Sequence, residues 1–441
     1  MMINFSNNIL SHRFSYEYLS HPQEALSQDY AFKILDNYVY AETSVLRYRK
    51  SLCMSFPFYM SNYTREISLT GSRELGISID KYLGESESSI GAGVGKLDIV
   101  DFLSNVFDES SDRICFGKLS EGPEFRKLIY SYAEGIYQKP RPKIALLDTI
   151  NLYFKKKRYF NLRSYLIENL SKAYSETSGL QPTDFGVNSL VDIYMHNSDV
   201  REFGKEGFVS VLMDVWFYIV KIIPTRLVNI VVDLSVEPNL YFILIQEQKD
   251  LIKKYGNDIT YNVTKEMVFM DAFIKESLNN STPASFIYRF IRKDIFLSNG
   301  TLLPKEQISS LNAFSKSVTN TSKSNRKFDI SKHILHNKSF TEPSIDNLIW
   351  GYGIKACPFA EYAGMLIKIF TALLVRKLYI FSNIQGNQPV HPGYVNIFTI
   401  FPSESSVYFK KHDINHYRDL INLEEEYKNI MNSDEAGLCS E

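Results

Sequence analysis

Apolar residues recur at helical spacing along most of the first 280 residues, and this periodicity constrains the fold more than any other feature of the chain. Short polar stretches separate the periodic segments, as expected for helices joined by loops. From about residue 284 the runs become β-prone and flank Ser298-Asn299-Gly300, a sequence typical of a hairpin turn. We therefore predict a mainly α fold with small β-sheets, with helices over residues 30–60, 96–108, 123–136, 160–175, 207–222, 226–255 and 264–279.

Three further segments follow the hairpin. Residues 315–333 are polar and without periodicity, so we expect irregular surface chain there, with His333 and His336 exposed. Residues 360–376 form a strong helical stripe, and residues 392–410 are strand-rich. The sequence also contains GAGVGK at 91–96, but its spacing is one residue short of a phosphate-binding loop, and we interpret it as a flexible loop.

The composition is that of a globular protein with 441 residues, 22% of them charged. A net charge of −1 argues against a nucleic-acid partner, and 29 Tyr and 30 Phe are enough to line an apolar pocket. Four scattered cysteines indicate a reducing compartment. The longest apolar stretches are interrupted by Lys221 and Lys368, so we predict no transmembrane segment and no membrane anchor.

We find no internal repeat and no long linker, which predicts one main domain. Its expected limits are residues 60–420, after a short N-terminal region (1–59) and before a polar tail (421–441). We expect a monomer in the cytoplasm or peripherally attached to the endoplasmic reticulum surface.

One thiol stands in a distinctive setting, in WGYGIKACPFAEYA at 350–363. Gly351 and Gly353 permit a tight loop, and a helix expected from about residue 359 would direct its positive end at the sulfur of Cys357. A buried core cysteine would also fit a lone Cys at a helix start. The alternative is a thiolate ligand of haem iron, which requires such a loop and N–H donors near the sulfur.

This stretch resembles the cysteine loop of the cytochrome P-450 family, Phe-x-x-Gly-x-x-x-Cys-x-Gly. Trp350 stands at the Phe position, Gly353 and Cys357 match, and Phe359 replaces the last Gly. The resemblance implies the cytochrome P-450 fold and haem b (iron protoporphyrin IX) ligated by the Cys357 thiolate. It also implies that Lys355, which stands where the family has Arg or His, meets a haem propionate.

A second resemblance lies upstream, in FIKESLNNSTPASFIYRFIRKDIFLSNGTLLPKE. Glu276 matches the Glu of the family's Glu-x-x-Arg motif, whereas Asn279 stands at the Arg position. The family buries that Glu in an ionic network, so Glu276 must titrate, be hydrated or pair with Lys332. Arg289 matches the family's Arg that binds a haem propionate.

The family's long central helix crosses the distal haem face and carries an acid or amide beside a Thr that relays protons to bound dioxygen. The DLSVEP segment at 233–238 resembles the end of that helix and places the distal window at YIVKII, with Tyr218, Ile219, Ile222 and Ile223 lining the pocket. The window has no acid and no Thr. Thr225 follows Pro224 and is either a displaced relay or an ordinary helix-surface threonine.

The sequence therefore resembles the monooxygenases of fungal secondary metabolism that oxidise terpenoids, including indole diterpenes and gibberellins. This implies a small apolar substrate, a flavin-containing reductase as electron donor and a haem-thiolate monooxygenase activity. Two alternatives remain: a haem-dependent isomerase or cyclase that does not activate dioxygen, and a non-catalytic relic.

Overall fold

The computed structural model describes most of the chain, and the account that follows concerns those residues. They are 8–28, 30–31, 55–85, 94–136, 145–177, 186–280, 286–312, 328–336, 338–345, 348–353, 356–382, 394–396, 399–400, 406–412 and 414. The expected helix over 30–60, the predicted tail at 421–441, Lys355 and most of the polar segment 315–333 lie outside them or are covered only in part.

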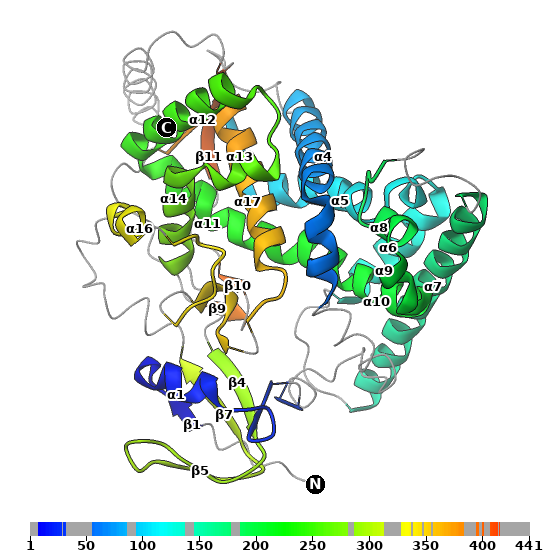
Figure 1. Cartoon of the computed structure of the whole chain (residues 1–441), viewed down its shortest axis with the longest axis vertical. Coiled ribbons are helices and arrows are strands. Elements are labelled where there is room, and N and C mark those ends of the chain that lie inside the picture. The colour runs from blue at the N-terminus through cyan, green and yellow to red at the C-terminus, as the bar shows by residue number, and fades with distance from the viewer. Residues whose placement is uncertain are drawn as a thin grey trace.

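Helix α17 (Ala360–Lys377) lies at the centre of the molecule (Figure 1). Its stripe of Met365, Ile369 and Leu373 is buried, and so are most of the side chains around the rest of its circumference. It therefore packs against helices on several sides: α4 (Thr64–Glu85), α11 (Ile223–Val236), α12 (Pro238–Tyr255) and α13 (Tyr261–Lys265). The predicted helix at 360–376 is confirmed.

The other predicted helices are present with different limits: residues 207–222 and the start of 226–255 form one continuous helix, Glu237 divides 226–255 into α11 and α12, and residues 96–98 are a strand. Helix α5 begins after Asp98, whose carboxylate accepts the backbone N–H groups of Val100 and Asp101 and so caps the helix. The remaining α-helices are α1 (Ser15–Ser20), α5 (Ile99–Phe116), α6 (Pro123–Ile136), α7 (Ala145–Thr177), α8 (Asp192–His196), α9 (Ser198–Glu202), α10 (Gly204–Phe217), α14 (Val268–Asn280) and α16 (Ser331–His336). Short 3₁₀ turns are η1 (His12–Phe14), η2 (Ser61–Tyr63), η4 (Gly117–Ser120) and η7 (Leu348–Trp350).

The strands form small sheets at the edges of the helical body. One sheet has the order β1-β7-β4-β2, with β1 parallel to β7 and the other pairs antiparallel, and it joins the N-terminal residues to the chain after α14. Figure 1 shows it with α1 at the end of the molecule opposite α12. Its strands are β1 (Asn8–Leu10), β2 (Leu26–Ser27), β4 (Phe286–Ile291) and β7 (Ile308–Asn312).

The predicted hairpin at Ser298-Asn299-Gly300 is confirmed, since β5 (Ile295–Phe296) pairs with β6 (Leu302–Leu303) around it. The strand-rich character of the C-terminal segment is confirmed as well, by strands β9 to β11. The remaining strands are β3 (Val94–Asp98), β8 (Leu378–Phe381), β9 (Tyr394–Asn396), β10 (Thr399–Ile400) and β11 (Ser406–Lys411), in sheets β3-β11-β8 and β10-β9.

Two local predictions are wrong. The end of GAGVGK is not a flexible loop, because Val94, Gly95 and Lys96 belong to β3 and pair with β11. The polar segment ends in helix α16 rather than in irregular chain, and His333 on that helix is not exposed: its side chain is only 9% accessible.

Candidate functional site

The cysteine loop is closed by backbone hydrogen bonds and leads directly into α17. The Cys357 N–H donates to the carbonyl of Trp350 at 2.6 Å, and the Ala356 N–H donates to the carbonyl of Gly353 at 3.0 Å. Gly351 and Gly353 have φ angles of 76° and 67°, in the left-handed region that glycine adopts without strain. The loop conformation therefore depends on the two glycines that the sequence singles out.

The Cys357 side chain is half-buried, three residues before α17 begins. Burial raises the pKa of the Cys357 thiol to about 11, although a hydrogen bond from the Phe359 backbone N–H acts in the opposite direction. That N–H and the positive end of α17 are the donors that a thiolate needs. These donors suit a cysteine that ligates haem iron. A metal that displaces the thiol proton would bind a negatively charged sulfur, and the Phe359 N–H already donates a hydrogen bond to that sulfur.

Arg289 lies on β4 and is 5% exposed. Its guanidinium donates to the Tyr288 carbonyl at 2.9 Å, and its backbone pairs with Ser309 on β7. Helix α1 covers the same strands, because the Tyr18 hydroxyl bonds to the Ser309 carbonyl and hydroxyl at 3.0 and 2.9 Å. Burial raises the pKa of Tyr18, which stays neutral.

Helix α1 also contacts the cysteine loop. The rings of Tyr16 and Tyr352 lie 6.2 Å apart, and a Cβ at Gly353 would lie 3.5 Å from the Leu19 carbonyl oxygen. One face of α1 thus contacts the loop while Tyr18 contacts the strand pair that carries Arg289. The structure therefore places Arg289 and the Cys357 loop on elements joined by α1, whereas Lys355 lies outside the described residues.

Glu276 on α14 is almost fully buried and has two cationic or polar partners. Its Oε2 lies 2.6 Å from Lys332 Nζ and 2.8 Å from His333 Nε2. Burial acts to raise the pKa of Glu276, but the hydrogen bonds from His333 and Lys332 outweigh it, so the pKa is lowered. The structure thus pairs Glu276 with Lys332, one of the options that the sequence left open, and gives it a second partner in His333, which was expected at the surface. Asn279, one turn further along α14, is half-buried.

The central helix runs without a break from Gly204 to Val236, and its middle is π-helical at η6 (Tyr218–Ile222). The Ile223 N–H bonds to the Tyr218 carbonyl, five residues back. Pro224 accounts for this irregularity, because it has no N–H to donate and its ring crowds the carbonyl four residues earlier. Among the described helices this one is long and apolar enough to cross a membrane, yet 72% of its most apolar window is buried inside the fold, as in a core helix.

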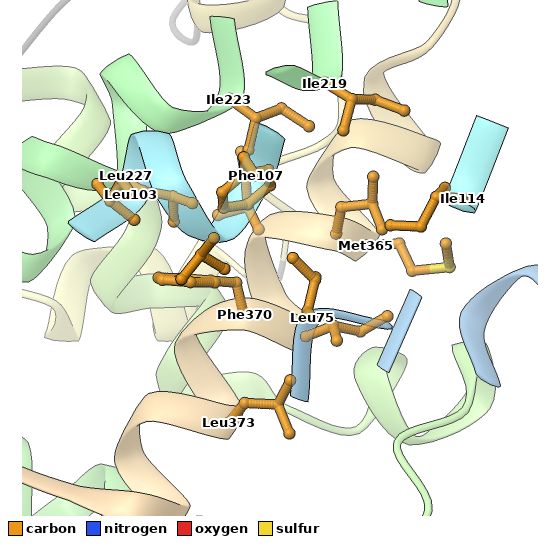
Figure 2. Close-up of a cluster of buried hydrophobic side chains, with 14 of the residues drawn as sticks. Leu75, Leu103, Phe107, Ile114, Ile219, Ile223, Leu227, Met365, Phe370 and Leu373 are labelled. Carbon is orange, nitrogen blue, oxygen red and sulfur yellow. The ribbon is translucent and has the colours of Figure 1, made fainter. Parts of the chain in front are cut away.

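The four residues predicted to line the distal pocket are divided between two faces of this helix. Ile219 and Ile223 are 1% and 3% exposed and belong to the main hydrophobic core, where Figure 2 shows them above Phe107 and Met365. On that face of the helix Ile219 and Ile223 pack against α5 and α17, and their place in the distal pocket stays a prediction.

The opposite face is partly open. Tyr218 is 49% exposed, and Ile222 and Thr225 are half-buried at helical spacing from it. The Thr225 hydroxyl donates to the Ile222 carbonyl at 2.7 Å, so its proton is committed to the helix backbone. The open face of the distal window thus presents the phenol ring of Tyr218, the branched aliphatic side chain of Ile222 and the Thr225 hydroxyl, which is bonded to the helix backbone.

The comparisons with known proteins agree with this geometry. The cytochrome P450 family model matches residues 57–392. Three curated relatives are fungal: cytochrome P450 monooxygenases paxP of Penicillium paxilli (30% identical, 32% of this chain and 28% of that protein), ffsD of Aspergillus flavipes (30%, 34% and 30%) and terP of Tolypocladium album (28%, 40% and 36%). The aligned regions thus span only about a third of the length of these relatives.

A solved structure shares the fold. The retinoic acid-bound cyanobacterial CYP120A1 superposes with a TM-score of 0.61 over 91% of this chain and 88% of that chain, at 14% sequence identity. At this identity the likeness concerns the fold alone, and the predicted fold class is confirmed. Because the family model matches well over half of the sequence, the chain belongs to the cytochrome P450 family.

Proposed function

We propose that this protein is a haem-thiolate monooxygenase that oxidises a small apolar molecule. The family uses haem b with a cysteine thiolate ligand, and within the matched residues 57–392 the sequence has two cysteines. Cys115 is fully buried in the hydrophobic core, whereas Cys357 lies in a glycine-shaped loop with the Phe359 N–H on its sulfur. The position of Cys357 at the start of α17 is the observation that carries the proposal.

In this proposal the Cys357 thiolate binds the iron, and Arg289 and Lys355 hold the propionates. Gly351, Gly353 and the Trp350 carbonyl shape the loop around the sulfur. The bound haem would supply the activation of dioxygen. The chain itself contributes a ligand whose charge is stabilised by the Phe359 N–H, and a buried guanidinium that offers charge-assisted hydrogen bonds to a carboxylate.

The substrate and partners follow from the open face of the central helix and from the family. Tyr218 and Ile222 offer apolar contacts and no charge, which suits a hydrocarbon-rich substrate, and we propose a terpenoid intermediate of fungal secondary metabolism. Members of the family receive electrons from a redox partner, and we propose a flavin-containing reductase. We further propose that the protein acts as a monomer in the cytoplasm or at the endoplasmic reticulum surface.

One observation supports a second candidate, a haem-dependent isomerase or cyclase. The window Tyr218–Ile223 contains no acid and no hydroxyl other than that of Tyr218, and the Thr225 hydroxyl is bonded to the backbone. A side chain that delivers protons to bound dioxygen must have a proton to give. A rearrangement of an apolar intermediate would not require that delivery, and a relic without activity would not require it either.

The carbon-monoxide difference spectrum of the reduced, purified protein tests the proposal. A red-shifted Soret band typical of thiolate ligation is expected, followed by a substrate-induced spectral shift with candidate terpenoids. Product that forms only with reductant and dioxygen would support the monooxygenase, and product without reductant the isomerase. The absence of any haem spectrum after reconstitution would favour the relic.

A further inference from the structure

A buried ion pair joins the two helices behind the cysteine loop. Lys368 on α17 and Asp271 on α14 lie 2.5 Å apart, with side chains that are 6% and 13% exposed. Lys368 also donates to the Thr264 carbonyl at 3.0 Å and lies over the Phe340 ring, 5.6 Å from its centre. In the sequence this lysine interrupts an apolar helical stripe, and a cation buried there requires partners.

Asp271 uses both of its oxygens to hold the segment that precedes the loop. Its Oδ2 accepts the backbone N–H of Phe340 at 2.8 Å, and its Oδ1 accepts the hydroxyl of Ser339 at 3.0 Å. Since Lys368 binds the same Oδ1, the lysine orients the carboxylate for these two bonds. The pair therefore fixes the backbone of residues 339–340 against α14 and α17.

That backbone is connected to Cys357 by two further hydrogen bonds. The Phe340 carbonyl accepts the indole N–H of Trp350 at 2.7 Å. The Trp350 carbonyl in turn accepts the backbone N–H of Cys357 at 2.6 Å. A continuous series of contacts thus runs from Lys368 through Asp271, Phe340 and Trp350 to the backbone of the cysteine.

The close approach of this segment to α17 depends on Gly364. A Cβ at that position would lie 2.2 Å from Thr341 Cγ2 and 3.0 Å from Phe340 Cζ. The Thr341 hydroxyl also donates to Glu361 at 2.7 Å, on the first turn of the same helix. The segment 339–341 is therefore seated on α17 within two turns of the point where the helix begins after Cys357.

We propose that Lys368 and Asp271 are positioning residues that set the placement of the Cys357 sulfur, with Phe340 and Trp350 transmitting their effect. A well-packed apolar pair would stabilise the fold as well as a buried ion pair does, so what Lys368 and Asp271 add is directional bonding. This inference rests on the proposed function, in which Cys357 ligates iron. It assigns to the pair an effect on ligation that is separate from its effect on folding.

The experiment uses Asp271→Asn, Trp350→Phe and the double variant Lys368→Met with Asp271→Leu. Trp350→Phe removes the indole N–H but keeps an aromatic ring, and the double variant leaves no unpaired buried charge, so both should fold. The carbonyl complex is measured by absorbance, as the ratio of the red-shifted thiolate band to the band of the thiol-ligated form. We expect each variant to lower that ratio about two- to tenfold, which corresponds to one lost hydrogen bond. In haem-free protein, alkylation of Cys357 should accelerate.

Arg376→Met is the matched control. Arg376 is a second buried cation on α17, bonded to Gln248 at 2.9 Å and to the Asn257 carbonyl at 2.8 Å, and its contacts do not lead to the loop. Its loss should lower the melting temperature without changing the band ratio. Variants with a lowered melting temperature but the wild-type ratio and alkylation rate would overturn the inference. A wild type without the thiolate band would instead contradict the proposed function itself.

Discussion

The two sides of the candidate haem site differ in the kind of side chains that form them. On the side of Cys357, buried polar groups are hydrogen-bonded in series, and even the buried Lys368 and Glu276 have close partners. On the side of the central helix, the distal window has neither an acid nor a threonine; its Lys221 pairs with Asp108, and the hydroxyl of nearby Thr225 bonds to its own helix. The elements around the cysteine loop are thus linked by hydrogen bonds, whereas the proposed distal window lacks the acid and the Thr of the family pattern.

The difference has a physical basis in what each side must do. A ligand has to be held in one geometry, and directional hydrogen bonds and buried ion pairs specify geometry at the cost of desolvation. A distal face that binds an apolar molecule benefits from area removed from water, which isoleucine and tyrosine supply. A further consequence is that substitutions near Cys357 should change haem binding, whereas those on the open face of the central helix should change how reductant is used.

The largest effect is expected at the ligand. Cys357→Ala should abolish the red-shifted Soret band of the reduced carbonyl complex, because alanine has no sulfur to coordinate the iron. The measurement is the difference spectrum of equal amounts of protein. Cys115→Ala, Cys53→Ala and Cys439→Ala are the controls and should keep the band; a Cys357→Ala protein that keeps it would show that the ligand is another residue.

The next effect in size is expected at Glu276, whose substitution should lower the free energy of unfolding. Its carboxylate is 3% exposed and is paired with Lys332 and His333. Glu276→Gln removes the anion, but Lys332 is half exposed and stays hydrated, so the cost is that of lost charge-assisted hydrogen bonds, about 1.5–3 kcal/mol in the free energy of unfolding. Urea denaturation measures it, with Glu266→Gln, from an exposed pair with Lys254, as the matched control that should change little.

The same carboxylate predicts a pH dependence. The pKa of Glu276 is lowered in the folded protein relative to its ordinary value of 4.5, so the unfolded state binds its proton first as the pH falls. The stability from this group is therefore fully present above pH 4.5 and is lost below it, as the pH falls through the folded pKa. The difference between wild type and Glu276→Gln in urea midpoint should shrink over that acid range; a constant difference down to pH 3 would contradict the assignment.

The fold was largely predictable, because local rules decide it. The stripe around Met365 predicted α17 and the Asn-Gly turn predicted the hairpin, whereas the helix predicted over 226–255 is interrupted because Pro238 forces the preceding residue out of helical conformation. The site was less predictable, since its contacts join residues far apart in the chain. Lys368 was visible only as an interruption of an apolar stripe, and its partner Asp271 lies 97 positions earlier.

Two features of the site show the same limit of reasoning from sequence. His333 lies in a polar segment and gave no sign of burial, yet α16 carries it onto Glu276. Ile219 and Ile223 fall within the aligned distal window, but helical geometry turns them toward α5 and α17 (Figure 2). Sequence spacing identifies which residues share a helix face; it does not show which face the rest of the molecule covers.

A moderate effect is expected at Arg289. If its buried guanidinium holds a haem propionate, Arg289→Ala removes a charge-assisted hydrogen bond worth about 1.5–3 kcal/mol, which is about 10- to 100-fold in haem dissociation. Transfer of haem to an acceptor protein measures the rate. Arg292→Ala is the control, since Arg292 is exposed three residues further along the chain. Equal rates in the two variants would mean that Arg289 supports only the strand pair and Tyr18.

The smallest effect is expected on the open face of the central helix, where Ile222→Thr and Ile223→Thr form a matched pair. Ile222 shares the half-open face with Tyr218 and Thr225, whereas Ile223 is 3% exposed in the core. A hydroxyl at 222 could donate a proton where substrate and dioxygen would meet, so we expect the ratio of oxygenated product to hydrogen peroxide to rise about two- to tenfold, the effect of one hydrogen bond. The hydroxyl at 223 would face Phe107 and Met365 and should lower stability without changing that ratio.

A gain with Ile223→Thr alone would mean that the helix presents the other face to the haem. Tight coupling of reductant use to product in the wild type would mean that Thr225 or an ordered water already serves as the proton donor.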